Sequence, residues 1–357
     1  MSTFDKIQFE NLLALIPEHG ASDLHLSAGA QPILRVGEEL VAGSEEILTS
    51  LKIEEIILPI LTEPQKIYLS EKRALMFGYT FPNGLRFKIN LFYQKNSLAA
   101  DLHYIAGTIK KFKDLGLPSS VDKVAEITEG LVIITGHFQA GKTTTAMSLV
   151  EYLNEIKQMK IITLEEPIEF ILANERGLIQ QREIGRDTPS FIDGLKDCLE
   201  ANVEVVVATR IENKEEAMLI LELAEQGRLV VAVTSANSVV SFLTKMFSFF
   251  DESEKERFQI IFSNTLKVVI CQKLVPDKNG QLILVPEIMF NNEAVRLAII
   301  NNKLNQVNNI IRTSGEENMI SFEQSLAAFV RKGQITLDQA MKHTEDPEEL
   351  KRKMAEE

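Results

Sequence analysis

The sequence predicts an α/β protein in two parts: an N-terminal α+β domain with an antiparallel sheet, then a domain with a mainly parallel sheet. In the first part, short segments alternate polar and apolar residues, and Asn83 and Gly84 supply the positive φ that a tight hairpin turn needs. In the second part, nearly continuous apolar strands alternate with helices, which is typical of a parallel sheet covered on both faces. The basic stretch at 110–120, "KKFKDLGLPSS", is punctuated by Gly and Pro and is the expected linker.

The elements of the first domain, residues 1–109, follow from local periodicity. Apolar side chains recur at helical spacing in "FDKIQFENLLALI", and His19 and Gly20 end that helix. The segment "DLHLS" alternates polar and apolar residues, as a half-exposed strand does. The expected elements are a helix over 4–16, strands over 23–27 and 32–36, an amphipathic helix over 50–61, a hairpin of strands over 74–81 and 85–93, and a strand over 98–105.

The second domain, residues 121–357, is expected to alternate strands and helices before it becomes mainly helical. The expected strands are 130–136, 160–167, 203–209 and 228–234, with helices over 142–156, about 190–200 and 214–225. Residues 253–345 are expected to be helical, apart from a hairpin-like apolar stretch at 268–289. The charged tail "EDPEELKRKMAEE" is either a solvated helix or disordered.

Composition narrows the class of protein. The chain carries 38 Lys and Arg against 51 Asp and Glu, and this net charge of −13 argues against broad binding to a phosphate backbone. Cys198 and Cys271 fit no C-x-x-C pattern and are expected to be buried free thiols, and the five histidines show no metal-ligand spacing. The sequence has no apolar run as long as a membrane span and no signal pattern at its start, so we expect the cytosol.

The segment "GHFQAGKT" matches the phosphate-binding pattern G-x-x-x-x-G-K-[ST]. It follows an apolar strand and opens a helix, so backbone N–H groups can wrap a phosphate at the helix N-terminus. Lys142 would reach the outer phosphates of a nucleotide, and the Thr143 hydroxyl would ligate Mg²⁺. The alternative is a Gly-flanked turn with a chance lysine. The candidate loop comprises Gly136, His137, Phe138, Gln139, Ala140, Gly141, Lys142, Thr143 and Thr144.

Two positions are unusual for such a site. Gln139 stands where related loops usually have glycine, and it would be strained if that position required a positive φ. The apolar strand at 205–208 runs out into Arg210, whereas phosphate loops of this kind usually work with a strand that ends in a carboxylate. Arg210 either contacts a phosphate oxygen or is a solvated loop charge. Glu165, which ends the strand before it, is a candidate for activating water, or else an acid that caps the turn before Pro167.

Several segments, in order along almost the whole chain, resemble those of one family. They are "ASDLHLSAGAQPILRV", "RFKIN", "ITLEEPIEF", "QREIGRDTPSFIDGLKDCL", "LAEQGRLV" and "EIMFNNEAVRLAIINNKLNQVNNII". Together with the phosphate loop, they resemble the PilT-type retraction ATPases of type IV pili, members of the secretion-ATPase superfamily. The resemblance implies a PAS-like N-terminal domain, then a RecA-like nucleotide-binding domain with C-terminal helices.

The resemblance also implies a ligand, an assembly and a location. ATP with Mg²⁺ would be held at a cleft between the two domains of each subunit in a hexameric ring. The ring would be a homo-oligomer or a mixed ring with an active paralogue, cytoplasmic and peripheral at the inner-membrane base of the pilus. Its partner would be the inner-membrane platform protein of the pilus, and no nucleic acid is expected.

The positions that carry chemistry in the family depart from its pattern. The Gly-Glu that ends the Walker B strand aligns with Thr209 and Arg210, the two histidines of the histidine box align with Arg228 and Ser235, and the two arginines that reach the γ-phosphate align with Lys88 and His103. The acidic box remains as Glu165 and Glu166, both candidate catalytic residues. We therefore expect an ATP-binding, weakly hydrolysing or regulatory ring subunit. The alternatives are an active retraction motor that uses Glu165 and, least favoured, a nucleic-acid translocase.

Overall fold

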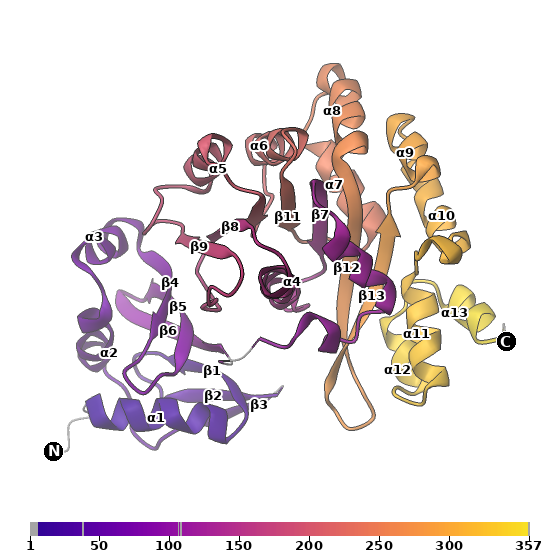
Figure 1. Ribbon diagram of the computed structural model, residues 1–357. Helices are drawn as coiled ribbons and strands as arrows, with labels where there is room; N and C mark the ends of the chain where they lie inside the picture. Colours follow the sequence, from indigo (N-terminus) through magenta and orange to yellow (C-terminus); the bar gives the residue numbers. More distant parts are fainter. Residues whose placement is uncertain (1–5, 38, 106, 108, 356–357) are drawn as a thin grey trace. The chain divides into compact units, whose positions relative to one another are not determined.

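The computed structural model describes residues 6–37, 39–105, 107 and 109–355 (Figure 1). The chain divides into two compact units. The first contains Met1–Thr108 and the short segment Glu166–Ile171, and the second contains Ile109–Glu165 and Leu172–Glu357. The predicted fold class, an α+β unit followed by a unit with a mostly parallel sheet, is confirmed.

The first unit is a fully antiparallel six-stranded sheet in the order β3-β2-β1-β6-β5-β4. Its strands are β1 (Ala21–Leu26), β2 (Ile33–Val36), β3 (Glu39–Ala42), β4 (Ala74–Thr80), β5 (Arg86–Gln94) and β6 (Ser97–Ile105), and its helices are α1 (Lys6–Glu18), α2 (Ser50–Ile57), η1 (Leu58–Ile60) and α3 (Glu63–Lys72). The predicted hairpin is confirmed, because β4 pairs with β5 and Gly84 has φ +83°. Leu13, Leu24 and Phe87 lie in its core.

Two elements of this unit escaped the sequence analysis. Strand β3 is exposed along its whole length, so it lacks the polar–apolar alternation that marks a strand, and its pairing with β2 defines it. Helix α3 buries only Leu69, which leaves a weak apolar stripe. Thr62 and Gln65 form a capping box there, and that local signal could have located the helix.

The second unit is a seven-stranded sheet in the order β13-β12-β7-β11-β10-β8-β9, parallel except for β13. Its strands are β7 (Gly130–Thr135), β8 (Lys160–Glu165), β9 (Leu178–Glu183), β10 (Val205–Ala208), β11 (Leu229–Val233), β12 (Leu266–Pro276) and β13 (Leu282–Phe290). Strands β7, β10 and β11 are buried at every residue, which explains their uninterrupted apolar sequences. Strand β9 was missed, because "LIQQRE" is polar and half exposed at the sheet edge.

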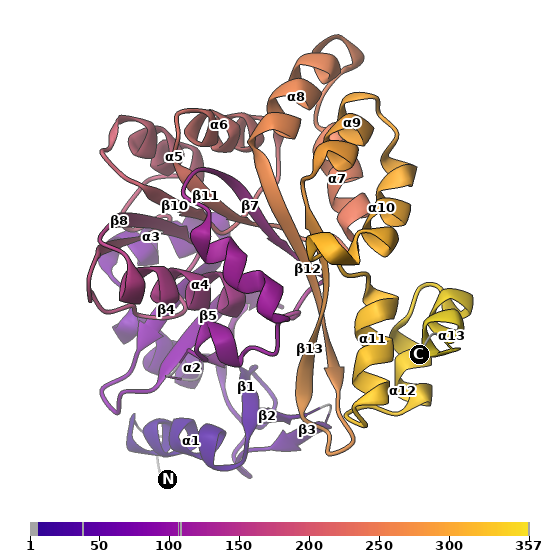
Figure 2. The ribbon, with the colours of Figure 1, turned by 45° about the vertical axis from the view of Figure 1, so that its right-hand side comes forward.

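Helices cover both faces of this sheet. The helical elements of this unit are η2 (Phe112–Asp114), η3 (Ser119–Glu126), α4 (Lys142–Ile156), α5 (Phe191–Glu200), α6 (Lys214–Glu225), α7 (Val239–Ser248), α8 (Glu252–Thr265), α9 (Glu293–Ile300), η4 (Leu304–Gln306), α10 (Val307–Thr313), η5 (Gly315–Glu317), α11 (Phe322–Arg331), α12 (Leu337–His343) and α13 (Pro347–Ala355). Helix α4 lies on the opposite side of the sheet from α5 and α6 (Figures 1 and 2). The predicted helices at 142–156 and 214–225 are confirmed with the same bounds.

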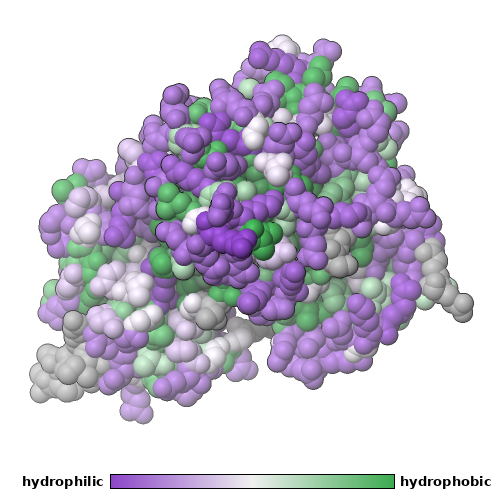
Figure 3. Space-filling model, viewed as in Figure 1, coloured by the Kyte–Doolittle hydropathy of each residue, from purple (hydrophilic) through white to green (hydrophobic). Residues whose placement is uncertain are grey.

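The C-terminal part carries the expected apolar hairpin, β12 and β13, and helices α11 to α13 lie beside it (Figure 2). The charged tail is a helix through Ala355, and Leu350 anchors it because that side chain is fully buried. The face seen in Figure 3 is mostly hydrophilic, with apolar residues scattered across it. Among the described residues, no helix is both long and apolar enough to cross a membrane.

Candidate functional site

The loop between β7 and α4 has the backbone of a phosphate cradle. Gly136 has φ +154°, and a Cβ there would lie 2.4 Å from the carbonyl oxygen of Gln272 on β12. Gly141 has φ +78° and forms the N-cap of the 15-residue helix α4. Both glycines are therefore required by backbone geometry. The helix N-terminus directs unpaired N–H groups toward the loop, where an anion binds favourably.

Gln139 has the strained backbone that its position predicts. Its φ is +60°, in the left-handed region that residues other than Gly and Asn rarely adopt. The neighbouring Phe138 is 83% exposed at the tip of the loop. The loop thus keeps the expected shape although the backbone conformation at Gln139 is one that glutamine rarely adopts.

Lys142 lies at the start of α4, and its ammonium group points back over the loop. Its Nζ donates a hydrogen bond to the carbonyl oxygen of His137 at 2.6 Å. Thr143 and Thr144 follow in the first helical turn and are half-buried. The loop offers a nucleotide phosphate a lysine, a helix N-terminus and two glycines at which a Cβ would be crowded or strained. The Thr143 hydroxyl is a suitable ligand for Mg²⁺.

Glu165 ends β8 as a fully buried carboxylate. Its Oε1 accepts hydrogen bonds from Thr163 Oγ1 at 2.6 Å and from Gln181 Nε2 at 2.9 Å. Sequence reasoning missed Gln181, because it lies on the unexpected strand β9 beside β8. Glu166, the next residue, is exposed and belongs to the segment that groups with the first unit.

Arg210 is bound to a buried carboxylate. Its Nε donates to Glu216 Oε1 at 3.2 Å, and its guanidinium lies 4.8 Å from the centre of the Phe191 ring. Glu216 is 1% exposed on α6, and its Oε2 accepts the backbone N–H of Glu212 at 2.8 Å. Arg210 therefore forms an ion pair with Glu216. The sequence suggested either a phosphate contact or a solvated loop charge for Arg210, and neither interpretation included this partner. A phosphate contact by Arg210 stays a prediction.

Thr209, beside Arg210, ties the end of β10 to the end of β8. Its N–H and its hydroxyl both donate to the carbonyl oxygen of Leu164, at 3.2 and 2.8 Å. A glycine at this position would keep the first bond and lose the second. Leu164 immediately precedes Glu165, so Thr209 helps to position that carboxylate.

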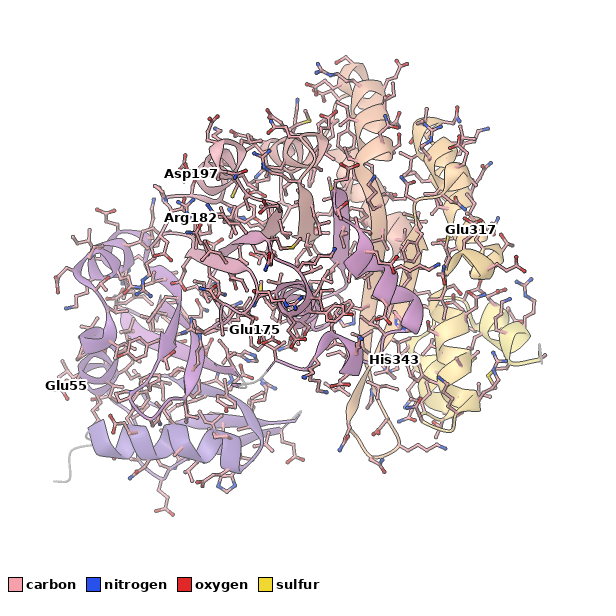
Figure 4. All side chains as sticks on the ribbon, viewed as in Figure 1. Glu55, Glu175, Arg182, Asp197, Glu317 and His343 are labelled. Carbon is pink, nitrogen blue, oxygen red and sulfur yellow. The ribbon has the colours of Figure 1, made fainter. Side chains whose placement is uncertain are left out.

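Arg228 caps the C-terminal end of helix α5. One guanidinium nitrogen donates to the carbonyl oxygens of Leu199 at 2.8 Å and Ala201 at 3.2 Å. A cation at this end of a helix also interacts favourably with the helix dipole. Helix α5 is held from β9 as well, by an ion pair of 2.8 Å between Arg182 and Asp197, which point toward one another in Figure 4.

Ser235, the other position that aligns with the histidine box, is exposed just beyond β11. The structure brings a lysine there that sequence reasoning missed. Lys245, on α7, donates through Nζ to Thr234 Oγ1 at 3.1 Å and to the carbonyl oxygen of Ser235 at 3.4 Å. Its local sequence is an ordinary amphipathic helix, so nothing near it in the chain marks this position.

Lys88 and His103 lie opposite each other on β5 and β6 of the first unit. Each has an acidic partner: Lys88 Nζ is 3.2 Å from Glu169 Oε1, and His103 Nδ1 is 2.9 Å from Asp23 Oδ1. Burial acts to raise the pKa of Asp23, but hydrogen bonds from His103 and Ser22 hold that pKa below its ordinary value. The two residues form one polar face with carboxylates already bound to it.

Comparisons with known proteins agree on one family. A family model described as "Type II/IV secretion system protein" matches residues 111–298. The type IV pilus retraction ATPase PilT of Pseudomonas aeruginosa is 30% identical over 337 residues, which are 94% of this chain and 98% of that protein. The type IV pilus ATPase PilU of the same organism is 29% identical over 346 residues, 97% of this chain and 91% of that protein. The uncharacterized protein YggR of Escherichia coli is 29% identical over 329 residues, 92% of this chain and 100% of that protein.

Solved structures give the same result. A crystal structure of the pilus retraction motor PilT with bound ADP has a TM-score of 0.85 and 32% identity, and the match covers 95% of this chain and 98% of that chain. The Legionella pneumophila ATPase DotB has a TM-score of 0.81 at 22% identity over 95% of this chain and 96% of that chain. At that identity, the second likeness shows the fold alone.

Proposed function

The chain belongs to the family of type II/IV secretion system proteins and is related over nearly its full length to PilT-type pilus ATPases, and from that premise we propose that it is an ATP-binding ring subunit that hydrolyses ATP slowly. The observation that carries the proposal is the ion pair between Arg210 and buried Glu216. Where the resemblance leads one to expect a carboxylate at the end of the Walker B strand, this chain has a cation that stabilises its own fold.

Binding is assigned to the loop at 136–144. Its N–H groups and Lys142 hold the phosphates, and Thr143 holds the Mg²⁺ that offsets their charge. The glycines at 136 and 141, which a Cβ would crowd or strain, support this assignment. These groups bind a nucleotide whether or not the site can activate water.

Hydrolysis needs a group that orients a water and accepts its proton. Arg210 is a donor only and stays protonated, so it can do neither. Loss of such help costs about 10²–10⁴ in rate. Glu165 is the alternative base, and it carries the second candidate function, an active retraction motor. The bonds from Thr163 and Gln181 fix the Glu165 carboxylate at the end of β8, as a base that orients a water requires.

The relatives support a proposal for the biological role. We propose action in type IV pilus retraction, as a regulatory subunit at the cytoplasmic side of the inner-membrane pilus base, where the platform protein is the partner. The subunits would have a domain at 1–109, a linker at 110–120 and a nucleotide-binding domain at 121–357. They would form a hexamer, either alone or mixed with an active paralogue.

Two measurements on the full chain test the proposal. Calorimetric titration with Mg-ATP should show binding that Lys142→Ala weakens strongly and that Lys196→Ala leaves unchanged, because Lys196 pairs with Glu215 on the exposed surface. Turnover should fall well below the usual enzyme range of about 1–10³ s⁻¹. Equal affinities for the native protein and Lys142→Ala would contradict the binding claim. Fast hydrolysis that both Lys142→Ala and Glu165→Gln abolish would establish the active motor instead.

A further inference from the structure

Gln272 lies directly against the phosphate loop, although it is distant in sequence. Strand β12 pairs in parallel with β7, with Cys271 opposite Thr135, so Gln272 comes level with Gly136 where the loop begins. Its side chain is fully buried. The sequence around it is an apolar strand, so nothing local marks this glutamine.

Three loop residues contact this one glutamine. Its Nε2 donates a hydrogen bond to the carbonyl oxygen of Ala140 at 2.5 Å. Its backbone oxygen would lie 2.4 Å from a Cβ on Gly136, and its Nε2 would lie 3.4 Å from a Cβ on Gly141. Gln272 therefore forms one wall of the loop.

Only half of the buried amide is used. The Oε1 atom has no hydrogen-bond partner among the residues that the structure describes. Rotating the amide would not help, because it would set Oε1 against the carbonyl oxygen of Ala140. A buried acceptor without a partner is unfavourable, and an apolar side chain of the same length would remove it only by leaving the Ala140 carbonyl oxygen without this donor. The buried amide is therefore present for its donor, which serves the Ala140 carbonyl oxygen.

The peptide geometry supplies that role. A peptide unit is planar and trans, so its C=O and the following N–H point in opposite directions. By holding the Ala140 carbonyl toward β12, Gln272 turns the N–H of Gly141 away from β12. That N–H lies at the N-cap of α4, where donors for a bound phosphate are needed.

We infer that Gln272 is a positioning residue for nucleotide binding: it orients the Ala140–Gly141 peptide so that its N–H serves the phosphate. The inference rests on the proposed function, because it presupposes a nucleotide in the loop. Gln272 thus adds a residue of β12 to the nucleotide site, and this residue lies outside the pattern G-x-x-x-x-G-K-[ST] of the loop.

The test compares Gln272→Met with Gln259→Met in the full chain. Gln259 is also buried in the second unit, on α8, so the control removes a buried amide away from the loop. Tm values measured without nucleotide show first that each variant is folded. For Mg-ATP, we expect the Kd of Gln272→Met to rise about ten-fold or more, while Gln259→Met matches the native protein.

Gln272→Glu provides a second readout, the dependence of the affinity for Mg-ATP on pH. An ionised glutamate cannot donate to Ala140, whereas a protonated one can, and burial raises the pKa of a carboxyl group. The affinity of this variant for Mg-ATP should recover as the pH falls from 8 toward 6, relative to the native protein at each pH.

Absence of Mg-ATP binding by the native protein would refute the proposed function itself. If the native protein binds but Gln272→Met binds within two-fold of it, the role of Gln272 is refuted. An affinity of Gln272→Glu that follows the native protein at every pH would refute it too, and this arm decides the matter if the methionine variant does not fold.

Discussion

Replacing Arg210 by methionine isolates the ion pair that separates this chain from the expected pattern of its family. The change would leave the Glu216 carboxylate, 1% exposed, with the Glu212 N–H still bound to Oε2 but without its cation. Breaking a buried ion pair from one side costs about 3–5 kcal/mol. The Arg210 side chain is 31% exposed, so water screens the pair, and we expect a loss of about 2–3 kcal/mol in the free energy of unfolding.

Urea unfolding at pH 7 measures this loss directly. Combining Arg210→Met with Glu216→Gln should return stability to within about 1 kcal/mol of the native protein, because the neutral amide oxygen still accepts the Glu212 N–H. Lys196→Met is a matched control: Lys196 and Glu215 are each 55% exposed, and this change should move stability by less than about 0.5 kcal/mol. A loss below about 0.5 kcal/mol for Arg210→Met would refute the view that Arg210 serves the fold.

The same geometry changes how hydrolysis can be restored. Arg210→Glu would set a second carboxylate beside Glu216, and like charges at a buried position are unfavourable. The informative variant is therefore Arg210→Glu together with Glu216→Gln. Thr209→Gly, which would complete the family pattern, also removes the hydroxyl bond to Leu164 and belongs in a separate variant.

Two further predictions concern stability. Burial raises the pKa of Glu287 to about 7. The nearby carboxylates of Glu323 and Glu345 also raise this pKa, whereas the hydrogen bond from the Val239 N–H and the charge of Lys273 lower it. Because the pKa in the folded state is the higher one, the contribution of Glu287 to stability is fully present below about pH 4.5 and is lost as the pH rises through about 7. Glu287→Gln should therefore flatten this part of the curve of Tm against pH. An unchanged slope would contradict the assignment of the pH dependence to Glu287. Gln139→Gly should relieve the strained φ of +60° and raise the free energy of unfolding by up to about 1 kcal/mol, measured in urea; a clear destabilisation would show that the Gln139 side chain is needed there.

Local features were predictable because a few adjacent residues decide them. The Asn83–Gly84 turn, the glycine-flanked loop and the positive φ of Gln139 each depend on backbone preferences within a short segment. The apolar runs of β7, β10 and β11 likewise predicted buried parallel strands, because burial on both faces leaves no polar positions. The polar edge strands β3 and β9 lack that signal, so their pairing partners alone define them.

The sequence by itself determined the two-part fold class, the phosphate loop and its lysine, and the absence of the expected carboxylate at position 210. The tertiary structure alone decided what the unusual side chains bind: Arg210 binds Glu216, Arg228 binds the end of α5, and Gln272 binds a loop 132 residues away. The physical reason is that backbone conformation responds to neighbours in the chain, whereas a hydrogen bond or ion pair forms only where folding brings a donor and an acceptor within about 3 Å.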